Sequence, residues 1–581
     1  MKLLLCALNA KYIHSNLAVY SLMAYAKDVP MELKLAEYTI NHRLEDIRKE
    51  IYREKADIVA FSCYIWNIDQ IYELTAELKK VAPETAIWLG GPEVSYDAGQ
   101  VLTQHPEIDV VMMGEGERTF RQLTHQWESG DLSGIAGITY RKEGQIVQQP
   151  MAPYMDMDEL PFVYEDLSKF ENKIIYYETS RGCPFSCSYC LSSIEKRVRL
   201  RSFSLVQKEL QFFLDHKVKQ VKFVDRTFNC NHVHAMQIWQ YLTEHDNGVT
   251  NFHFEVSADL LRDEDIALFQ KMRPGLIQLE IGVQSTHPQT IGEIKRTMDL
   301  DRLRELVSKV KALRNIHQHL DLIAGLPYED YQTFQKSFDE VFSMEPDQLQ
   351  LGFLKVLKGS YMHEQREQYQ LAYENRAPYE VLQTKWISYD EILELKEVEE
   401  MVELYYNSAQ YTKTLPYLMQ FASGPFAFFQ TLAAYYQANH TIGVKYSRLA
   451  YYELLRDFAK ATYPVEEACL DQLLMYDLYL RENIKKRPVW ANTTALEKKE
   501  ATRFYRQEET AQYFTDMVPY DSKKAAGSCH VEKFDIDMDT YEKREWWALF
   551  RYDARDPLTY DAQVLEVKGM EDGEGKSSGN M

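Results

Sequence analysis

Two successive alternations of short apolar segments with helix-length segments place the strongest constraint on the fold of this chain. In the first, helix-like segments such as 68–81 and 117–128 separate apolar runs at 2–8, 31–38, 57–64, 86–91 and 109–116. Apolar strands that alternate with helices are typical of a parallel sheet covered by helices on both faces. We therefore predict an α/β fold in which residues 1–140 form a doubly wound, Rossmann-like parallel sheet. Such sheets bind ligands beyond the carboxyl ends of their strands.

The second alternation begins near residue 170. Its strand candidates are 173–180, 220–228, 251–259, 275–283, 319–327 and 348–356. The helix-length segments between them are 204–216, 231–246, 262–273, 299–314 and 328–343. Six strand candidates in this order predict a central, partial (β/α)6 barrel of the TIM type over residues 169–362. Active sites of such barrels lie at the carboxyl ends of the strands.

The remaining segments complete the predicted domain organisation. Residues 141–168 are rich in proline and acidic side chains and are expected to be a linker. Residues 363–560 carry long Tyr- and Leu-rich helical segments with a short β-like finish, so a mostly helical C-terminal domain is expected. Residues 561–581 end in a polar, glycine-rich run that predicts a disordered tail.

Charge and cysteine content exclude several classes of function. The chain has 66 Lys and Arg against 88 Asp and Glu, a formal net charge of -22, which disfavours binding to nucleic acid and to anionic membrane surfaces. The sequence shows no signal-peptide cleavage site and no apolar run long enough to span a membrane, so a cytoplasmic protein is expected. Only three of the eight cysteines lie close together, which indicates metal chemistry rather than a disulfide framework.

The clustered cysteines, Cys183, Cys187 and Cys190, stand in the stretch RGCPFSCSYC directly after the first barrel strand. An iron–sulfur cubane is usually held by four thiolates, so three leave one iron with an open coordination position. Gly182 permits close approach of the backbone before the first ligand. A structural zinc site is the alternative, and it would need a fourth ligand such as Cys230 or a histidine. Zinc ligands usually come as two separated pairs, so the compact triple favours the cluster.

This CxxxCxxC stretch, with the aromatic Tyr189 before its last cysteine, resembles the signature of the radical S-adenosylmethionine (radical SAM) superfamily, and the resemblance extends over residues 169–360. It implies that the three cysteines hold a [4Fe-4S] cluster whose open iron binds the amino and carboxylate groups of S-adenosylmethionine. It further implies reductive cleavage to a 5′-deoxyadenosyl radical, with a flavodoxin- or ferredoxin-type protein as electron donor. The task of the chain is then to position and shield the radical.

The same resemblance assigns contacts with S-adenosylmethionine to polar residues at the ends of the barrel strands. Carboxylates and amides there suit ribose hydroxyls, an ammonium group or the adenine edge. The residues are Asp225 after the second strand, Glu255 and Ser257 on the third, Glu280, Gly282, Gln284 and Ser285 on the fourth, and Gly325 after the fifth. The alternative is that each residue only ends a strand, because strand ends commonly lead into polar loops.

The first domain resembles the cobalamin-binding domain that precedes a class of these enzymes. The motifs that carry this resemblance are, in order, Ser62, Gly90 with Gly91, and Gly114-Glu115-Gly116. They imply a channel for the nucleotide tail of cobalamin, in which side chains at the glycine positions would collide with the cofactor. The family's Asp-x-His-x-x-Gly motif is absent after the first strand, where His14 is the only nearby imidazole. His14 is either a cobalt ligand or, as we favour, a polar loop or helix-cap residue, and a domain emptied of cofactor is a further alternative.

Together these patterns predict an anaerobic radical SAM enzyme that uses cobalamin to methylate or rearrange an unactivated carbon of a small molecule. Residues 370–560 resemble an uncharacterised C-terminal domain of some cobalamin-dependent radical enzymes, and their aromatic stretches at 402–411 and 431–440 favour core packing over a substrate pocket. The alternatives are a radical SAM cyclase or lyase that does not use cobalamin chemically, and a non-enzymatic iron–sulfur redox sensor. A full set of S-adenosylmethionine contacts at a barrel mouth argues against the sensor.

Overall fold

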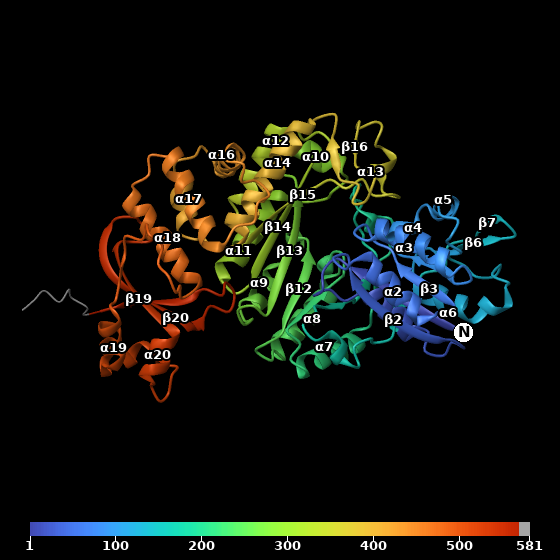
Figure 1. Cartoon of the computed structure of the whole chain (residues 1–581), viewed down its shortest axis with the longest axis horizontal. Helices are drawn as coiled ribbons and strands as arrows, with labels where there is room; N and C mark the ends of the chain where they lie inside the picture. The colour runs from blue at the N-terminus through green and yellow to red at the C-terminus, as the bar shows by residue number, and fades with distance from the viewer. Residues whose placement is uncertain (569–581) are drawn as a thin grey trace, which may run out of the picture. The chain divides into compact units, whose positions relative to one another are not determined.

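The computed structural model describes residues 1–568, so the end of the expected tail, residues 569–581, lies outside the described residues (Figure 1). The chain divides into two compact units. The first consists of residues 1–337 and 351–392, and the second consists of residues 338–350 and those from 393 onward. Within the described residues, no helix combines the length and the apolar character that a membrane crossing requires.

The first sheet has seven strands in the order β2-β1-β3-β4-β5-β6-β7. Strands β1 to β5 are parallel, and β6 and β7 form an antiparallel hairpin at one edge. The strand order reverses beside β1, and a ligand crevice forms at such a switch point. The Rossmann-like sheet predicted from the sequence is confirmed. The strands are β1 Lys2–Asn9, β2 Glu32–Thr39, β3 Ile58–Ser62, β4 Ala86–Gly90, β5 Val110–Met112, β6 Ile138–Lys142 and β7 Gln145–Gln148.

Helices cover both faces of this sheet, which explains why its strands read as continuous apolar runs. Residues such as Leu4 and Phe61 form one buried core with α2, α3 and α5, while Leu5 and Trp88 form a second core with α1 and α6. The helices are α1 Leu17–Tyr25, α2 Leu44–Glu54, α3 Ile68–Val81, α4 Pro92–Ser95, α5 Ala98–Gln104 and α6 Gly116–Gln126.

The second sheet has six strands in the order β15-β14-β13-β12-β11-β8, which follows their order along the chain. Figure 1 shows β12, β13, β14 and β15 of this sheet. Strands β8 and β15 are the outer strands, and the sheet is therefore an open, partial barrel, as predicted. The strands are β8 Ile175–Tyr177, β11 Gln220–Phe223, β12 Asn251–Val256, β13 Ile277–Gln284, β14 His317–Ala324 and β15 Gln348–Phe353. The helices of this part are α7 Phe203–Asp215, α8 His232–Glu244, α9 Asp263–Phe269, α10 Pro288–Glu293, α11 Leu300–Leu313 and α12 Tyr331–Phe342.

One face of the barrel sheet is polar and half-buried. Along β12 the buried residues Phe252 and Phe254 alternate with the half-buried residues His253 and Glu255. Strands β13 and β14 show the same alternation. A closed TIM barrel fills its interior with branched apolar side chains. This sheet instead carries half-buried polar side chains on one face.

The second unit contains the Tyr- and Leu-rich helices predicted from the sequence. Tyr405, Tyr411 and Tyr436, from the two aromatic stretches, are buried, which confirms core packing. The unit also carries a four-stranded sheet in the order β18-β19-β20-β21. Strand β21 lies beyond residue 561 and pairs with β20, so the expected start of a disordered tail at 561 is wrong for Ala562–Val567. The elements are α14 Tyr389–Met401, α15 Thr414–Met419, α16 Pro425–Ala438, α17 Arg448–Thr462, α18 Glu467–Arg481, β18 Thr494–Ala495, α19 Lys498–Arg506, α20 Ser522–Ser528, β19 Cys529–Ile536, β20 Lys543–Arg555 and β21 Ala562–Val567.

Candidate active site

The cysteine loop leaves the barrel and returns to it at one narrow neck. Strand β9, Ser180–Arg181, pairs antiparallel with β10, Arg199–Leu200, so residues 182–198 form a closed loop just after β8. Gly182 lies at this neck with a φ of +91°, and a Cβ atom there would come closer than 3.0 Å to the carbonyl oxygen of Arg197. The glycine before the first cysteine is therefore required by the chain itself.

The three cysteines are free thiols inside this loop. Cys183 and Cys187 are buried, and Cys190 is half-buried. Among the residues that the structure describes, the three sulfur atoms are not a set that lies within 4.8 Å of one another. Sulfur ligands of one zinc ion, each about 2.3 Å from the metal, would be roughly 3.8 Å apart. The loop between β9 and β10 thus holds all three thiols that the sequence predicts as cluster ligands.

Arg296, which the sequence analysis missed, lies against the cysteine loop. Its Nη1 is 3.7 Å from the sulfur of Cys187 and 3.4 Å from the hydroxyl of Tyr189, and its Nη2 donates to the carbonyl of Gly282. Burial opposes the charge of Arg296, but the neighbouring tyrosine and thiol hold its pKa above the usual value. The only sequence signal that could have indicated a role for Arg296 is its position in a polar segment after the fourth barrel strand.

Several buried polar atoms around the loop have no hydrogen-bond partner within the described part of the chain. They are Oε1 of Gln284, Nε of Arg296 and Oγ of Ser188. Gln284 also follows a register shift in β13 and has a φ of +73°, a conformation that non-glycine residues rarely adopt. Orphaned buried polar atoms and strained backbone of this kind occur at ligand sites. The residues at the loop therefore fit a pocket that a polar cofactor completes.

Asp225, expected to contact S-adenosylmethionine, is instead used inside the protein. It is 1% exposed, and its carboxylate accepts hydrogen bonds from the backbone N–H of Thr179 at 2.9 Å and from the hydroxyls of Thr179 and Ser180 at 2.6 Å. Burial raises the pKa of Asp225 to about 6, although these hydrogen bonds lower it. Its oxygen atoms fix the segment just before the cysteine loop and are not directed to a ligand.

Three other predicted residues also have partners within the chain. The hydroxyl of Ser257 donates to Asp259 at 2.6 Å, and that of Ser285 donates to Glu329 at 2.6 Å. A side chain at Gly325, which has a φ of +87°, would collide with Val381. Contacts within the chain therefore account for Ser257, Ser285 and Gly325, and no contact with a ligand is needed to explain them.

The predicted carboxylates Glu255 and Glu280 differ in their surroundings. Glu280 lies 2.9 Å from both Lys222 and His253. Burial opposes its charge, but these two partners lower the pKa of Glu280 to about 2. The side chain of Glu255 has no hydrogen-bond or ion-pair partner among residues 1–568, and burial together with Glu280 raises its pKa to about 7. Glu255 is therefore the carboxylate of this pair that is available to a ligand.

Glu280 also belongs to the one group of metal-ligating side chains that the described residues bring within 4.8 Å of one another, with His319 and Asp321. His319 and Asp321 lie 2.9 Å apart, and Lys222 already neutralises Glu280. The ligating atoms of this group thus have charged neighbours within the barrel.

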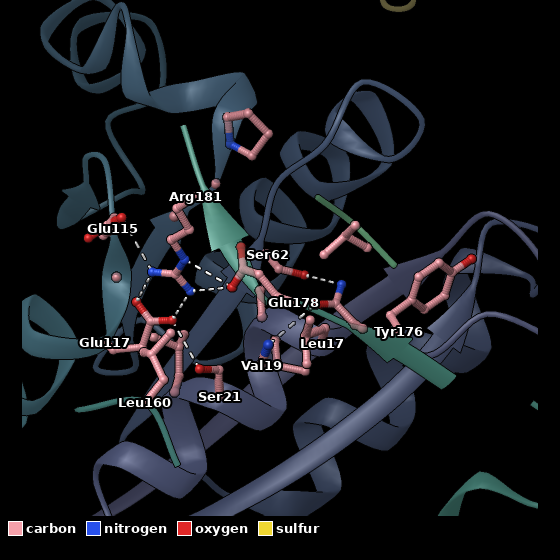
Figure 2. A pocket seen from close by; sticks show the side chains of 18 of the residues that line it. Leu17, Val19, Ser21, Ser62, Glu115, Glu117, Leu160, Tyr176, Glu178 and Arg181 are labelled. Atoms are coloured by element: carbon pink, nitrogen blue, oxygen red, sulfur yellow. Dashed lines mark hydrogen bonds and ion pairs between the residues drawn. The ribbon is translucent and has the colours of Figure 1, made fainter. Parts of the chain in front are cut away.

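A cavity of about 1240 Å³ joins the first sheet to the neck of the cysteine loop (Figure 2). The carboxyl ends of β1, β3, β4 and β5 form one wall, and residues such as Tyr176, Glu178 and Arg181 form the other. All of them belong to the first compact unit. The cavity also brings together every residue that the cobalamin resemblance singled out: Ser62, Gly90, Gly91, Gly114, Glu115 and Gly116.

Two glycines of this cavity wall, Gly91 and Gly114, are required by the conformation and packing of the chain itself. Gly91 has a φ of +120°, and a Cβ atom there would come closer than 3.0 Å to the carbonyl oxygen of Cys63. Gly114 has a φ of +74° and faces the side chain of Met151. Packing of the chain therefore accounts for these two glycines even before a ligand is considered, which differs from the steric reason expected from the sequence.

Polar side chains in the same cavity are held by neighbours. Ser62 accepts a hydrogen bond from Asn16 at 3.0 Å. His14 lines the cavity, and its Nδ1 is 2.6 Å from the hydroxyl of Tyr176. Burial lowers the pKa of His14, so the neutral imidazole is favoured. This contact ties the loop after β1 to strand β8.

Comparison with known proteins agrees with this arrangement. Three family models match separate parts of the chain: a B12-binding domain at 4–124, the radical SAM superfamily at 177–341, and a protein family of unknown function, DUF4080, at 367–550. TokK, a cobalamin-dependent radical SAM methyltransferase of Streptomyces tokunonensis, is 28% identical over 305 residues, which are 48% of this chain and 44% of TokK. An anaerobic magnesium-protoporphyrin IX monomethyl ester cyclase of Synechocystis sp. is 25% identical over 54% of this chain and 64% of the cyclase. The chain thus spans less than two thirds of the length of each of these two relatives.

A solved structure shows the same fold. OxsB, a cobalamin-dependent S-adenosylmethionine radical enzyme solved with aqua-cobalamin, matches with a TM-score of 0.56 at 14% identity, over 90% of this chain and 84% of OxsB. The chain therefore carries a radical SAM domain at residues 177–341, preceded by a B12-binding domain at residues 4–124. Cobalamin, a [4Fe-4S] cluster and S-adenosylmethionine are the cofactors of these two types of domain.

Proposed function

We propose that this enzyme is a methyltransferase that modifies an unactivated carbon of a small-molecule substrate. The single cavity that joins the strand ends of the B12-binding domain to the neck of the cysteine loop carries this proposal, because both cofactor sites border one space. The similarity to a cobalamin-dependent methyltransferase supports it. When bound, the cluster with S-adenosylmethionine supplies a 5′-deoxyadenosyl radical, and cobalamin supplies a transferable methyl group.

The residues of the loop have distinct proposed roles. Cys183, Cys187 and Cys190 would hold the cluster. Arg296, beside Cys187, is the cation that would balance the thiolate charge and attract the carboxylate of S-adenosylmethionine. Glu255 would attract the sulfonium cation or accept hydrogen bonds from the ribose.

The cavity wall has two proposed tasks. Ser62 and the glycines at the ends of β4 and β5 would lie along the cobalamin. Apolar side chains of the wall, such as Tyr64, Trp66, Leu191 and Ile194, would exclude water from the reacting atoms. We propose a flavodoxin- or ferredoxin-type protein as the source of electrons, as the family resemblance implies.

The function can be tested on the anaerobically reconstituted protein by measuring both products of S-adenosylmethionine. A methyltransferase of this type is expected to form S-adenosylhomocysteine as well as 5′-deoxyadenosine, and to lose the former when cobalamin is omitted. Formation of 5′-deoxyadenosine alone would favour a cyclase or lyase, and a cyclase is among the relatives of this chain. Absence of both products, in a protein that holds its cluster, would contradict an enzymatic role and leave the sensor.

Binding of S-adenosylmethionine is expected to weaken as the pH falls through about 7. The pKa of Glu255 is raised to about 7 by burial, Glu280 and Asp321, against the opposing charges of Arg226 and Lys222. Below this pH the carboxyl group is neutral and attracts the sulfonium less. Calorimetry on the cluster-loaded protein should show an affinity about tenfold lower at pH 6 than at pH 8.

A matched pair of variants separates this effect from general pH dependence. Glu255→Gln should bind more weakly and show a flat profile, while Glu264→Gln, which removes an exposed carboxylate of the same barrel, should keep the wild-type profile. An unchanged slope in Glu255→Gln would show that another group titrates.

A further inference from the structure

Two arginines stand directly opposite each other at the neck of the cysteine loop. Arg181 of β9 and Arg199 of β10 are cross-strand partners. Like charges at such positions repel and destabilise the pair. Glutamates near the neck offset part of this repulsion, because Glu178 lies 2.9 Å from Arg181 and Glu195 lies 2.9 Å from Arg199.

The other acidic partners of both arginines come from the B12-binding domain. Glu117 receives two bonds from Arg181, Nη2 to Oε1 at 2.7 Å and Nη1 to Oε2 at 3.2 Å, which is a bidentate pair. Arg199 donates to both carboxylate oxygens of Glu115, one of them at 3.3 Å. Figure 2 shows Arg181 between Glu115, Glu117 and Glu178. We call Arg181, Arg199, Glu115 and Glu117 the arginine latch.

Burial makes the latch different from a solvated surface ion pair. The side chain of Glu117 is 6% exposed and that of Arg199 is 9% exposed. Glu117 also accepts from the hydroxyl of Ser21 at 3.0 Å, and Arg199 donates to the carbonyl of Met155 at 2.6 Å. Loss of one partner would leave a buried charge without compensation, which is far more costly than loss of a surface pair.

The same acidic residues border the cobalamin cavity. Glu115 and Glu117 stand at the start of α6, and Gly114, Glu115, Gly116 and Glu117 all line the cavity. Glu115 was predicted to contact the ligand, but its carboxylate already accepts hydrogen bonds from Arg199 and from the N–H of Met155 at 2.9 Å. These bonds within the chain are an alternative role for Glu115. A molecule seated against this turn would fix the start of α6, and with it the two carboxylates that hold the neck.

We propose that the arginine latch couples cobalamin binding to the loading of the cluster loop. Cobalamin in the cavity fixes the start of α6. The ion pairs of the arginine latch then fix β9 and β10 at the neck. The cysteine loop is thereby held in the conformation that binds its cluster. Because coupling between two binding sites is reciprocal, a loaded cluster must strengthen cobalamin binding by the same factor. The latch residues act through the loop and are positioning residues. This inference rests on the proposed use of both cofactors by one enzyme.

The coupling is measured by the dissociation constant of hydroxocobalamin for the full-length protein with and without its cluster. The cluster-loaded wild type is expected to bind at least about fivefold more tightly than the metal-free wild type. Glu117→Gln should reduce this ratio to near one. The control Glu159→Gln removes a carboxylate that also pairs with an arginine of α6, Arg118 at 3.0 Å, but is exposed, and it should keep the wild-type ratio.

A second measurement guards against a variant that fails to fold. In the metal-free protein, hydroxocobalamin should slow amide hydrogen exchange in peptides that cover residues 182–198, and this protection should be lost in Glu117→Gln and reduced in Arg181→Lys. Equal affinities of the two wild-type forms, or a preserved ratio in Glu117→Gln, would overturn the latch alone. Failure of the wild type to bind either cofactor would overturn the proposed function together with the latch.

Discussion

Replacing Cys187 with alanine is expected to reduce formation of 5′-deoxyadenosine by at least about 10³-fold, because Cys187 is one of only three thiolates that we propose as ligands of the cluster. Cys187 is buried, and its sulfur lies 3.7 Å from Nη1 of Arg296. The measurement is the yield of 5′-deoxyadenosine per chain after anaerobic reconstitution, together with iron and sulfide content.

The control for this change is Cys469→Ala, which removes a buried free thiol outside the loop and should leave the yield unchanged. Undiminished product in Cys187→Ala would show that the loop does not hold the catalytic cluster. Spectroscopic detection of zinc rather than iron in the wild type would contradict the site as a whole.

Changing Gly182 to alanine should also be severe, although no metal ligand is touched. The residue has a φ of +91°, and its new Cβ would meet the backbone of Arg197. Strained dihedrals and a backbone collision together are expected to cost about 3–5 kcal/mol at the neck. Iron content after reconstitution should therefore fall well below that of the wild type, with faster hydrogen exchange in the loop.

Gly144→Ala is the matched control for this prediction. Gly144 also has a positive φ, +80°, but no atom lies within 4 Å of the position of its Cβ. Only the backbone strain of about 1–2 kcal/mol should appear there, without loss of iron. Equal iron content in Gly182→Ala and in the wild type would mean that the neck does not govern loading of the loop.

The elements of the fold and the position of the cysteine loop after the first barrel strand were predictable because their signals are local. Apolar runs identify parallel strands, and three cysteines within eight positions identify a loop that can hold a cluster. Each of these signals depends on neighbouring residues in the chain. Burial on both faces of the first sheet makes its strands especially easy to recognise.

The roles of polar residues were less predictable because their partners are distant in sequence. Asp225 bonds to Thr179, 46 residues away, and Glu115 bonds to Arg199, 84 residues away. A carboxylate at a strand end looks the same in sequence whether it faces a ligand or another segment of the protein. Arg296 was missed for the same reason, since only the folded chain brings it to Cys187.

The chain passes back and forth between the two compact units, and this restricts the positions at which the polypeptide can be truncated. The radical SAM family match ends at residue 341, but the first unit takes in residues 351–392 as well. A polypeptide shortened at the family boundary would lose β15 and the residue that packs over Gly325, Val381. The barrel would then end at β14, with its outer edge open to water. Any dissection of this enzyme into parts should therefore keep the chain intact through residue 392.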